Sequence, residues 1–313
     1  MIDILMATYN GEAFLEEQLN SIINQSYTKW HLLVRDDCST DGTEAILHGY
    51  SEMYPEKISV IINKERTGSA KANFFKLLHD AKSKYIMFCD QDDIWKRNKI
   101  EITLRKMRQL EKKKGDNIPI LVATDLEVVD AKGNQLDKSF LHYMNLPGNI
   151  SLQHLLIQNN ITGCTVMINR KLCDMLKKVT SVEKIVMHDH FAGLVAVSFG
   201  KAALLRETTI QYRQHEKNSV GAMNANSFAY MYQRFRRGKS QFQKDMKDSM
   251  EQAGYLFMLY KDIFEEEPVR EKQMIWQYSQ LVDKSRIQKY RVYFKYHVFK
   301  HGLIRRVMQL IWC

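Results

Sequence analysis

The sequence predicts an α/β fold in which a mostly parallel, mixed sheet is flanked by helices and followed by a helical C-terminal region. Over about the first 125 residues, short apolar runs alternate with segments of helical periodicity, the order of a parallel sheet with helices on both faces. From about Asn224 onward, Tyr, Phe, Met, Gln and basic residues dominate while Gly and Pro become scarce, which predicts helices. An apolar content of 45% is typical of a globular protein.

The expected elements follow in chain order. Five strands are apolar runs bounded by polar residues, at 2–7, 31–34, 58–62, 85–89 and 120–124. Helices are expected after the first strand, after the second strand with Asp41 as candidate N-cap, and at 70–81 and 96–114. The less regular middle of the chain predicts helices at 152–158 and 189–199, and strands at 165–168, 202–205 and 210–212.

Polar clusters follow each of the first four expected strands, at 8–10, 36–41, 63–68 and 90–93. Ligands of open α/β sheets bind beyond the carboxyl ends of the strands, so these clusters are expected to line one crevice. Ordinary polar loops would explain any single cluster, but they explain four at equivalent positions less well. The sequence therefore favours a functional crevice at this edge of the sheet.

The densest of these clusters is acidic. Asp90, Asp92 and Asp93 directly follow the apolar run 85–89, so like charges are crowded at the end of a buried strand. Such a cluster costs stability unless a cation neutralises it, and carboxylate oxygens suit a hard ion such as Mg²⁺ or Mn²⁺. The segment is therefore a candidate metal site, and a metal at a strand end suggests chemistry on a phosphate.

The net charge indicates which kinds of molecule the protein binds, and the cysteine content indicates the redox state of its compartment. The net charge of +10 and the pI near 9.2 favour anionic partners. The five cysteines are odd in number and widely spaced without a CxxC pair, which favours reduced thiols over a disulfide framework or a zinc site. We expect no signal peptide and no spanning helix, and hence a soluble or peripheral protein on the cytoplasmic side.

The order of these motifs along the chain resembles family 2 glycosyltransferases, which have the GT-A (Rossmann-like) fold. The matching segments are Thr8–Asn10, Asp36–Asp37, the DxD-type motif Asp90–Asp93, then Asp189 and His215. The resemblance covers roughly residues 1–221, expected to form the catalytic domain, and leaves 222–313 as a helical basic region. It implies an inverting transferase that uses a nucleotide-diphosphate sugar and Mg²⁺ or Mn²⁺. The divalent ion would offset negative charge on the departing nucleotide diphosphate.

The resemblance also implies a role for each matched residue. The nucleotide-sugar site would comprise Thr8, Asn10, Asp36, Asp37, Asp90, Gln91 and Arg213. A carboxylate after the second strand can accept the N3 proton of uracil or thymine, although Cys38 stands where the family usually has Gly. The metal would be held by Asp90, Asp92, Asp93 and His215. Asp189, about 100 positions after the DxD motif, would be the general base that deprotonates the acceptor hydroxyl.

Simpler explanations stay open for several of these residues. Taken alone, Asp189 is better explained as a helix N-cap, and a lone histidine such as His215 is more often structural. The segment 163–165 has two explanations: it either lines the acceptor side of the site, or it forms a tight turn that leads into a strand. Its residues are Gly163, Cys164 and Thr165. His190 and Phe191 stand where many relatives have two aromatic residues, which suggests a different acceptor.

The string Cys89–Trp95 resembles bacterial members that transfer L-rhamnose or related sugars in surface-polysaccharide assembly. It implies dTDP-L-rhamnose as donor and a lipid-linked or growing glycan as acceptor. One alternative is a transferase of a UDP-hexose or UDP-N-acetylhexosamine. Nucleotidyl transfer would need a Gly-rich basic loop after the first strand, and none is present. A non-catalytic membrane- or glycan-binding protein on a degenerate scaffold is disfavoured by the intact Asp90, Asp92 and Asp189.

The last thirty residues are strongly basic, with no acidic residue after Asp283. Tyr290, Tyr293, Phe294, His297 and the run 303–311 interleave with Lys and Arg, as in an amphipathic helix on an anionic membrane. This predicts a peripheral protein at the inner face of a bacterial membrane. The alternative is a packed helix pair with a solvated basic face. No nucleic-acid-binding motif accompanies the charge, so nucleic acid is not an expected partner.

Overall fold

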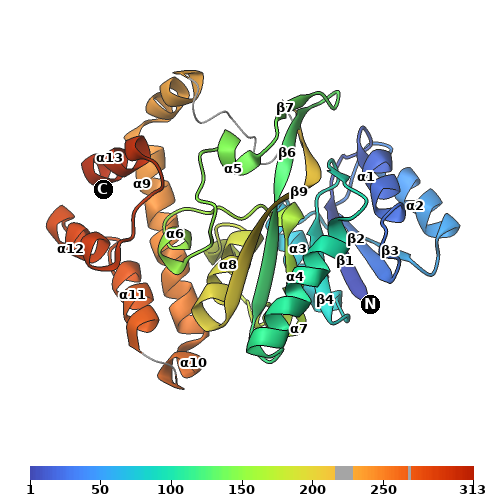
Figure 1. The fold of residues 1–313 in the computed structure, drawn as a ribbon. Coiled ribbons are helices and arrows are strands. Elements are labelled where there is room, and N and C mark those ends of the chain that lie inside the picture. The colour runs from blue at the N-terminus through green and yellow to red at the C-terminus, as the bar shows by residue number, and fades with distance from the viewer. Residues whose placement is uncertain (216–227, 267–268) are drawn as a thin grey trace.

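A nine-stranded mixed sheet forms the centre of the molecule in this computed structural model, which describes residues 1–215, 228–266 and 269–313. The strand order is β3-β2-β1-β4-β8-β6-β9-β5, with β7 paired to β6. Helices cover both faces of the sheet, and the C-terminal helices gather at the end of the molecule opposite α1 and α2 (Figure 1). The predicted mostly parallel sheet flanked by helices, with a helical C-terminal region, is confirmed.

The first half of the sheet is parallel and follows the predicted alternation. Its elements are β1 (Ile2–Thr8), α1 (Leu15–Ile23), β2 (Trp30–Asp36), α2 (Thr43–Met53), β3 (Ile58–Ile62), α3 (Ala70–Asp80) and β4 (Tyr85–Cys89). β1 lies between β2 and β4, and its register sets Thr8 opposite Asp36 and Met6 opposite Cys89. The carboxyl ends of these strands therefore meet at one edge, as the sequence predicts.

The second half of the sheet is mixed. It comprises β5 (Ile94–Trp95), α4 (Lys99–Lys114), β6 (Ile120–Asp130), β7 (Gln135–Asp137), α5 (Phe140–Tyr143), α6 (Leu152–Leu155), η1 (Gly163–Thr165), β8 (Met167–Asn169), α7 (Arg170–Leu176), η2 (Val182–Lys184), α8 (His188–Phe199) and β9 (Lys201–Gln214). β8 runs antiparallel between β4 and β6, and β9 pairs parallel with β6 and antiparallel with β5.

Several element boundaries differ from the predictions, and the strand expected at 120–124, for example, runs on to Asp130. The expected strands 202–205 and 210–212 are one strand, β9, whose pairing with β6 shifts register near Asp125. The expected helix 96–114 begins at Lys99 because Ile94 and Trp95 pair with β9. The strand expected at 165–168 begins at Met167, after the short 3₁₀ turn η1. The helix expected at 152–158 ends at Leu155.

The C-terminal region is helical as predicted. It comprises α9 (Phe228–Leu259), α10 (Lys261–Glu266), α11 (Val269–Ser279), α12 (Arg286–Tyr296) and α13 (Leu303–Trp312). α9 is broken at Gly238, whose φ of +78° is one that other residues rarely adopt. Tyr293, which the sequence suggested for a membrane face, is instead fully buried, whereas Phe294 is exposed.

Two hydrophobic cores lie on opposite faces of the sheet. One packs α1, α2 and α4 against residues such as Met6 and Met87. The other packs α3, α7 and α8 against residues such as Phe88, and it continues without interruption into Met250 and Tyr278 of the C-terminal helices. The helical region therefore shares a core with the α/β half of the chain. The predicted boundary between 221 and 222 lies outside the described residues.

Two further findings concern cysteines and membranes. All five cysteines are free thiols, in agreement with the expected absence of a disulfide framework. Among the helices of the described residues, none combines the length and apolar character needed to cross a bilayer.

Candidate functional site

The loop after β2 is organised by Asp36, which is fully buried. Its carboxylate accepts hydrogen bonds from Thr8 Oγ1 (2.8 Å), from the Ser39 backbone N–H (2.7 Å) and from Ser39 Oγ (2.6 Å). The bond to Thr8 joins the ends of two adjacent parallel strands. Asp36 and Thr8, both predicted to bind the nucleotide, therefore lie together and hold the loop that would contact it.

Asp37 holds a second loop, the one that follows β3. It accepts hydrogen bonds from the Thr67 N–H (2.7 Å), Thr67 Oγ1 (3.0 Å), the Gly68 N–H (2.9 Å) and Asn63 Nδ2 (2.9 Å). Burial opposes its ionisation, but these donors outweigh burial and lower the pKa of Asp37 below its ordinary value. Asp37 is therefore a carboxylate at neutral pH.

Two residues at this edge have left-handed backbone conformations. Cys38 has a φ of +62° and Asn10 a φ of +47°. A positive φ suits glycine best, which explains why glycine is usual where this chain has Cys38. The side chain of Asn10 accepts a hydrogen bond from the Thr40 N–H (2.8 Å), and its own N–H donates to Ser39 Oγ (2.9 Å). Asn10 thus joins the loop after β1 to the loop after β2.

Gln91 ties the acidic loop to the end of β1. Its Oε1 accepts from the Tyr9 N–H (2.9 Å) and its Nε2 donates to the Tyr9 carbonyl (3.1 Å). A Cβ at Gly11 would lie 2.5 Å from Gln91 Oε1, so only glycine leaves room for this contact. The predicted donor-site residue Gln91 therefore acts on the loop backbone in this structure.

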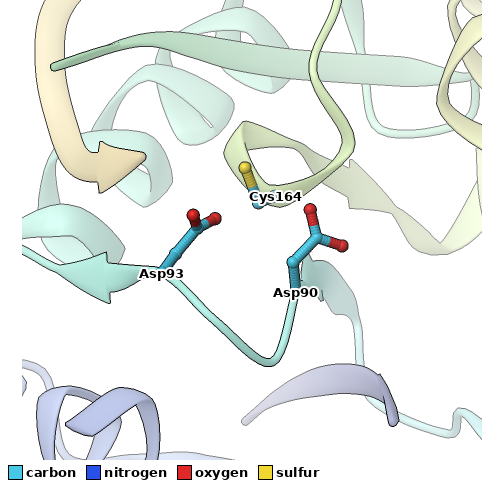
Figure 2. Close-up of side chains that lie close together, drawn as sticks. All are labelled: Asp90, Asp93 and Cys164. Atoms are coloured by element: carbon cyan, nitrogen blue, oxygen red, sulfur yellow. The ribbon is translucent and has the colours of Figure 1, made fainter. Parts of the chain in front are cut away.

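Asp90 and Asp93 project from the two ends of the acidic loop towards Cys164 (Figure 2). One ligand-type atom of each residue lies within 4.8 Å of the others. Burial, together with repulsion from Asp92 and Asp189, raises the pKa of Asp90 to about 7. Burial and the charges of Asp92 and Asp90 raise the pKa of Asp93 well above its ordinary value. Burial likewise raises the pKa of the Cys164 thiol, which is therefore protonated beside them.

Asp92 takes a different partner from the other two carboxylates. Its Oδ2 lies 2.9 Å from His215 Nε2, and both side chains are largely buried. The His215 ring packs against Phe14 with the ring centroids 4.8 Å apart. The structure therefore brings together Asp92 and His215, two predicted metal ligands that are 123 positions apart in the sequence.

Arg213 contacts protein groups on several sides. Its guanidinium donates to the Asp92 carbonyl (3.1 Å) and the Ala131 carbonyl (3.0 Å), and it pairs with Glu17. The Arg213 N–H also donates to Asp93 Oδ1 (3.3 Å), and the side chain is almost fully buried. The resemblance placed Arg213 in the nucleotide-sugar site. In the structure its contacts hold the acidic loop.

These residues fit a divalent cation. Asp90, Asp92 and Asp93 share one loop, where burial and the charge of Asp92 raise the pKa of Asp90 and of Asp93, and Asp93 Oδ2 is buried with no hydrogen-bond partner among the described residues. Carboxylate oxygens match the ligands of Mg²⁺ or Mn²⁺, and those of Asp90 and Asp93 lie together, whereas Asp92 and His215 form a separate pair outside that group. The protonated thiol of Cys164 is a poor ligand for such ions, so it is better explained as a hydrogen-bond donor to the carboxylates.

Asp189 lies in the first turn of α8, but it is not the N-cap, because Met187 occupies that position. Its Oδ1 accepts from the His190 N–H (2.6 Å) and from Asn159 Nδ2 (3.3 Å). Burial raises the pKa of Asp189 to about 7, despite these hydrogen bonds. The charge of Asp189 also contributes to the raised pKa of Asp90, so the two carboxylates belong to one electrostatic site.

The histidines on either side of Asp189 have roles that sequence reasoning missed. His188 stacks on Phe74 with the ring centroids 4.0 Å apart, and burial lowers its pKa to about 3. A Cβ at Gly163 would lie 2.9 Å from His188 Nε2, so Gly163 is required by this packing. His190 Nε2 lies 2.5 Å from the Leu155 carbonyl and its Nδ1 lies 3.3 Å from Gln252 of α9. The helix that carries Asp189 is therefore anchored to the C-terminal region.

Comparison with known proteins agrees with this geometry. The family model described as "Glycosyl transferase family 2" matches residues 3–170. The chain is 31% identical to the dTDP-rhamnosyl transferase RfbG of Shigella flexneri over 228 residues, covering 69% of this chain and 74% of the relative. It is 35% identical over 172 residues to the putative teichuronic acid biosynthesis glycosyltransferase TuaG of Bacillus subtilis, covering 55% of this chain and 63% of the relative.

Solved structures show the same fold. Staphylococcus aureus TarS 1–349 in complex with UDP-GlcNAc matches with a TM-score of 0.55 and 16% identity, covering 95% of this chain and 76% of TarS. The mannosyltransferase PcManGT of Pyrobaculum calidifontis, in complex with GDP-Man and Mn²⁺, matches with a TM-score of 0.57 and 14% identity, covering 99% of this chain and 78% of that one. At these identities the likeness concerns the fold alone.

Proposed function

Because this chain belongs to glycosyl transferase family 2 and is a glycosyltransferase, we propose that it is an inverting enzyme of bacterial surface-polysaccharide assembly. The favoured reaction moves L-rhamnose from dTDP-L-rhamnose onto a lipid-linked or growing polysaccharide. The observation that carries this proposal is the convergence of the acidic loop with Asp189 beyond the strand ends. The likeness to a dTDP-rhamnosyl transferase supports the donor. In this proposal residues 1–221 form the catalytic domain and 222–313 a basic helical region.

The nucleotide binds along the loops that Asp36 and Asp37 hold. Thr8 and Asn10 set the positions of these loops, and Asp37, whose pKa is lowered, offers an ionised carboxylate. A carboxylate of this kind accepts the N3–H of a thymine or uracil base. Gln91 and Arg213 keep the acidic loop against this nucleotide side through Tyr9 and Asp92.

A Mg²⁺ or Mn²⁺ ion would be held by Asp90, Asp92, Asp93 and His215. When bound, this ion would supply electrostatic stabilisation of the charge that develops on the departing nucleotide diphosphate. The chain prepares this position by burying Asp90 and Asp93 beside Asp92, because burial and the charge of Asp92 raise the pKa of both buried carboxyls. Arg213 holds the acidic loop in place by donating hydrogen bonds to the Asp92 carbonyl and the Asp93 carboxylate.

Asp189 is the general base. A carboxylate with a pKa of about 7 is well matched to accept a proton from the acceptor hydroxyl at neutral pH. Asn159 and the His190 N–H bond Oδ1 and so orient the carboxylate. A single displacement, in which the acceptor oxygen attacks the anomeric carbon as the nucleotide leaves, inverts the configuration at that carbon.

A UDP-hexose or UDP-N-acetylhexosamine is the second candidate donor. It is favoured by 29% identity over 172 residues to an Escherichia coli β-1,3-glucosyltransferase, WfgD, whose name specifies UDP-Glc and a diphosphoundecaprenol acceptor. The likeness to WfgD also supports the proposal that the acceptor is lipid-linked. The proposed location is accordingly the cytoplasmic face of the bacterial membrane, where the protein binds peripherally to anionic lipid.

A donor panel tests the proposed function. The purified chain is incubated with dTDP-L-rhamnose and with UDP-glucose, UDP-galactose and UDP-N-acetylglucosamine, with Mg²⁺ or Mn²⁺, and nucleotide release is measured. We expect release from dTDP-L-rhamnose to be fastest and to stop when the metal is chelated. Faster release from a UDP-sugar would replace the favoured donor by the second candidate. Absence of release from every nucleotide sugar would favour a non-catalytic binding protein.

A further inference from the structure

The last helix, α13, turns its apolar side chains outward. Leu303, Ile304, Val307 and Ile311 are 79%, 55%, 44% and 56% exposed, respectively. These positions are separated by one, three and four residues, so they share one side of the helix. We call this set the α13 face.

The opposite side of α13 points into the protein, where Met308 and Trp312 pack against the hydrophobic core and two polar side chains make hydrogen bonds. Arg305 is 6% exposed, and it donates to the carbonyls of Asn145 and Met144, each at 2.6 Å. Gln309 is fully buried, where it accepts from the Lys300 N–H (2.8 Å) and donates to the Val298 carbonyl (3.0 Å). A surface helix of a soluble protein normally exposes a polar side instead of a second apolar one. Core packing and hydrogen bonds therefore fix the helix with the α13 face outward.

The surroundings of the α13 face are cationic. Arg306 on the same helix is exposed, and its guanidinium lies over Phe299, whose ring contacts the exposed Phe294 of α12. α12 contacts α13 through the Tyr290 hydroxyl, which donates to the Leu310 carbonyl, and it carries the exposed Arg291 and Lys295. No acidic residue occurs in the sequence after Asp283. Two copies of this face would repel each other, whereas an acidic lipid surface complements it.

We propose that the α13 face seats this protein on an anionic phospholipid surface. Leu303, Ile304, Val307 and Ile311 enter the headgroup boundary while the neighbouring basic side chains contact lipid phosphates. The inference rests on the proposed function only in its purpose, which is to bring the enzyme to a lipid-linked acceptor. The basic charge of the C-terminal region does not by itself identify the surface that contacts the lipid, and the α13 face does.

Hydrogen bonds connect this surface with the helix that carries Asp189. Lys300 Nζ donates to the Ile157 carbonyl (3.1 Å), and the His301 N–H donates to Gln158 Oε1 (3.0 Å). Both partners directly follow α6, whose Leu155 carbonyl contacts His190 of α8. Docking through α13 therefore holds the acceptor side of the site, rather than the nucleotide side, in a defined relation to the lipid surface.

Vesicle flotation tests the proposal with the full chain. The probes are phosphatidylcholine vesicles with and without phosphatidylglycerol, without donor or acceptor. The test variant is the triple change Leu303→Gln, Val307→Gln and Ile311→Gln. Met53→Gln with Met258→Gln is the matched control, because these side chains are 66% and 59% exposed on other helices. We expect the triple variant to bind anionic vesicles about tenfold more weakly or worse, and the control to bind like wild type.

Two outcomes would overturn the proposal. One is unchanged binding of the triple variant to anionic vesicles. The other is a wild-type chain that is dimeric in solution and becomes monomeric in the triple variant, which would make the face an interface between copies. Thermal melting of all variants shows that they are folded. Nucleotide release from the donor panel separates the two proposals, because vesicle binding without release would contradict only the proposed function.

Discussion

The carboxylates on the two sides of the site are built in opposite ways. On the nucleotide side, Asp36 and Asp37 accept several hydrogen bonds from neighbouring loops, and the pKa of Asp37 is lowered. On the transfer side, burial raises the pKa of both Asp90 and Asp189 to about 7, and like charges add to the rise at Asp90. The carboxylates of the nucleotide side therefore have their hydrogen-bond partners without a ligand. The carboxylates of the transfer side carry negative charge that a ligand must neutralise.

The two sides of the site therefore contribute differently to folding stability and to ligand binding. Carboxylates that already have donors hold loops in place and add to stability. Crowded carboxylates with too few hydrogen-bond donors destabilise the free protein. Binding a cation or a proton removes that destabilisation, so the crowding strengthens cation and proton binding. The predictions below test this contrast, from the largest expected effect to the smallest.

Asp189→Asn should have the largest effect, and it should be confined to transfer. Loss of the base is expected to lower the rate of sugar transfer about 10²–10⁴-fold. Donor affinity, measured by calorimetry, should stay near the wild-type value because Asp189 lies on the acceptor side. The exposed Asp174→Asn serves as control. Weakened donor binding with normal transfer would locate the base elsewhere.

The pH profile should reflect the same carboxylate. Because the pKa of Asp189 is about 7, the transfer rate of the wild type should fall as pH drops below that value and the base becomes protonated. A transfer rate that is flat between pH 5.5 and 8 would be inconsistent with Asp189 as the base.

Asp37→Asn tests the nucleotide side. An asparagine there accepts fewer hydrogen bonds, because its NH₂ group replaces one carboxylate oxygen and faces the N–H of either Thr67 or Gly68. We expect a loss of about 1–3 kcal/mol in the free energy of unfolding, measured in urea, together with weaker donor binding. The control Asp174→Asn should change stability by at most about 0.5 kcal/mol. A variant as stable as wild type would show that these hydrogen bonds contribute nothing net.

Asp90→Asn should act on stability in the opposite direction. The folded-state pKa of Asp90 lies above its unfolded value, so its favourable contribution is complete below about pH 4 and is lost as pH rises through about 7. In chelator at pH 7.5, the neutral asparagine should therefore raise the free energy of unfolding by on the order of 1–2 kcal/mol. At pH 4 the variant and wild type should be nearly equal. A destabilised variant at pH 7.5 would contradict the assigned cause.

Sequence patterns predicted the parallel half of the sheet well because each buried strand is an apolar run that ends in a polar cluster. They also located the acidic loop, since three carboxylates after a buried strand have few structural explanations. The mixed half was harder. Ile94 and Trp95 form a strand only because β9, more than 100 residues later, lies beside them.

The partners of the site residues were the least predictable part. Arg213 meets Glu17 across 196 positions, and nothing local in either segment indicates this pairing. Cys164 was placed near the acceptor side, but its position between Asp90 and Asp93 depends on the antiparallel strand β8. α13 showed a helical alternation of apolar and polar residues, which does not say which side faces the protein.

The central claim is that the acidic loop binds a divalent cation that neutralises its charge. Its most direct test is a Mn²⁺ titration of metal-free wild type and Asp92→Ala at pH 7.5, followed by the melting temperature. Mn²⁺ should raise the melting temperature of wild type by a few degrees in a saturable way, as expected for a ligand that binds only the folded state. Asp92→Ala should show no such rise. Equal stabilisation of both proteins would contradict the account.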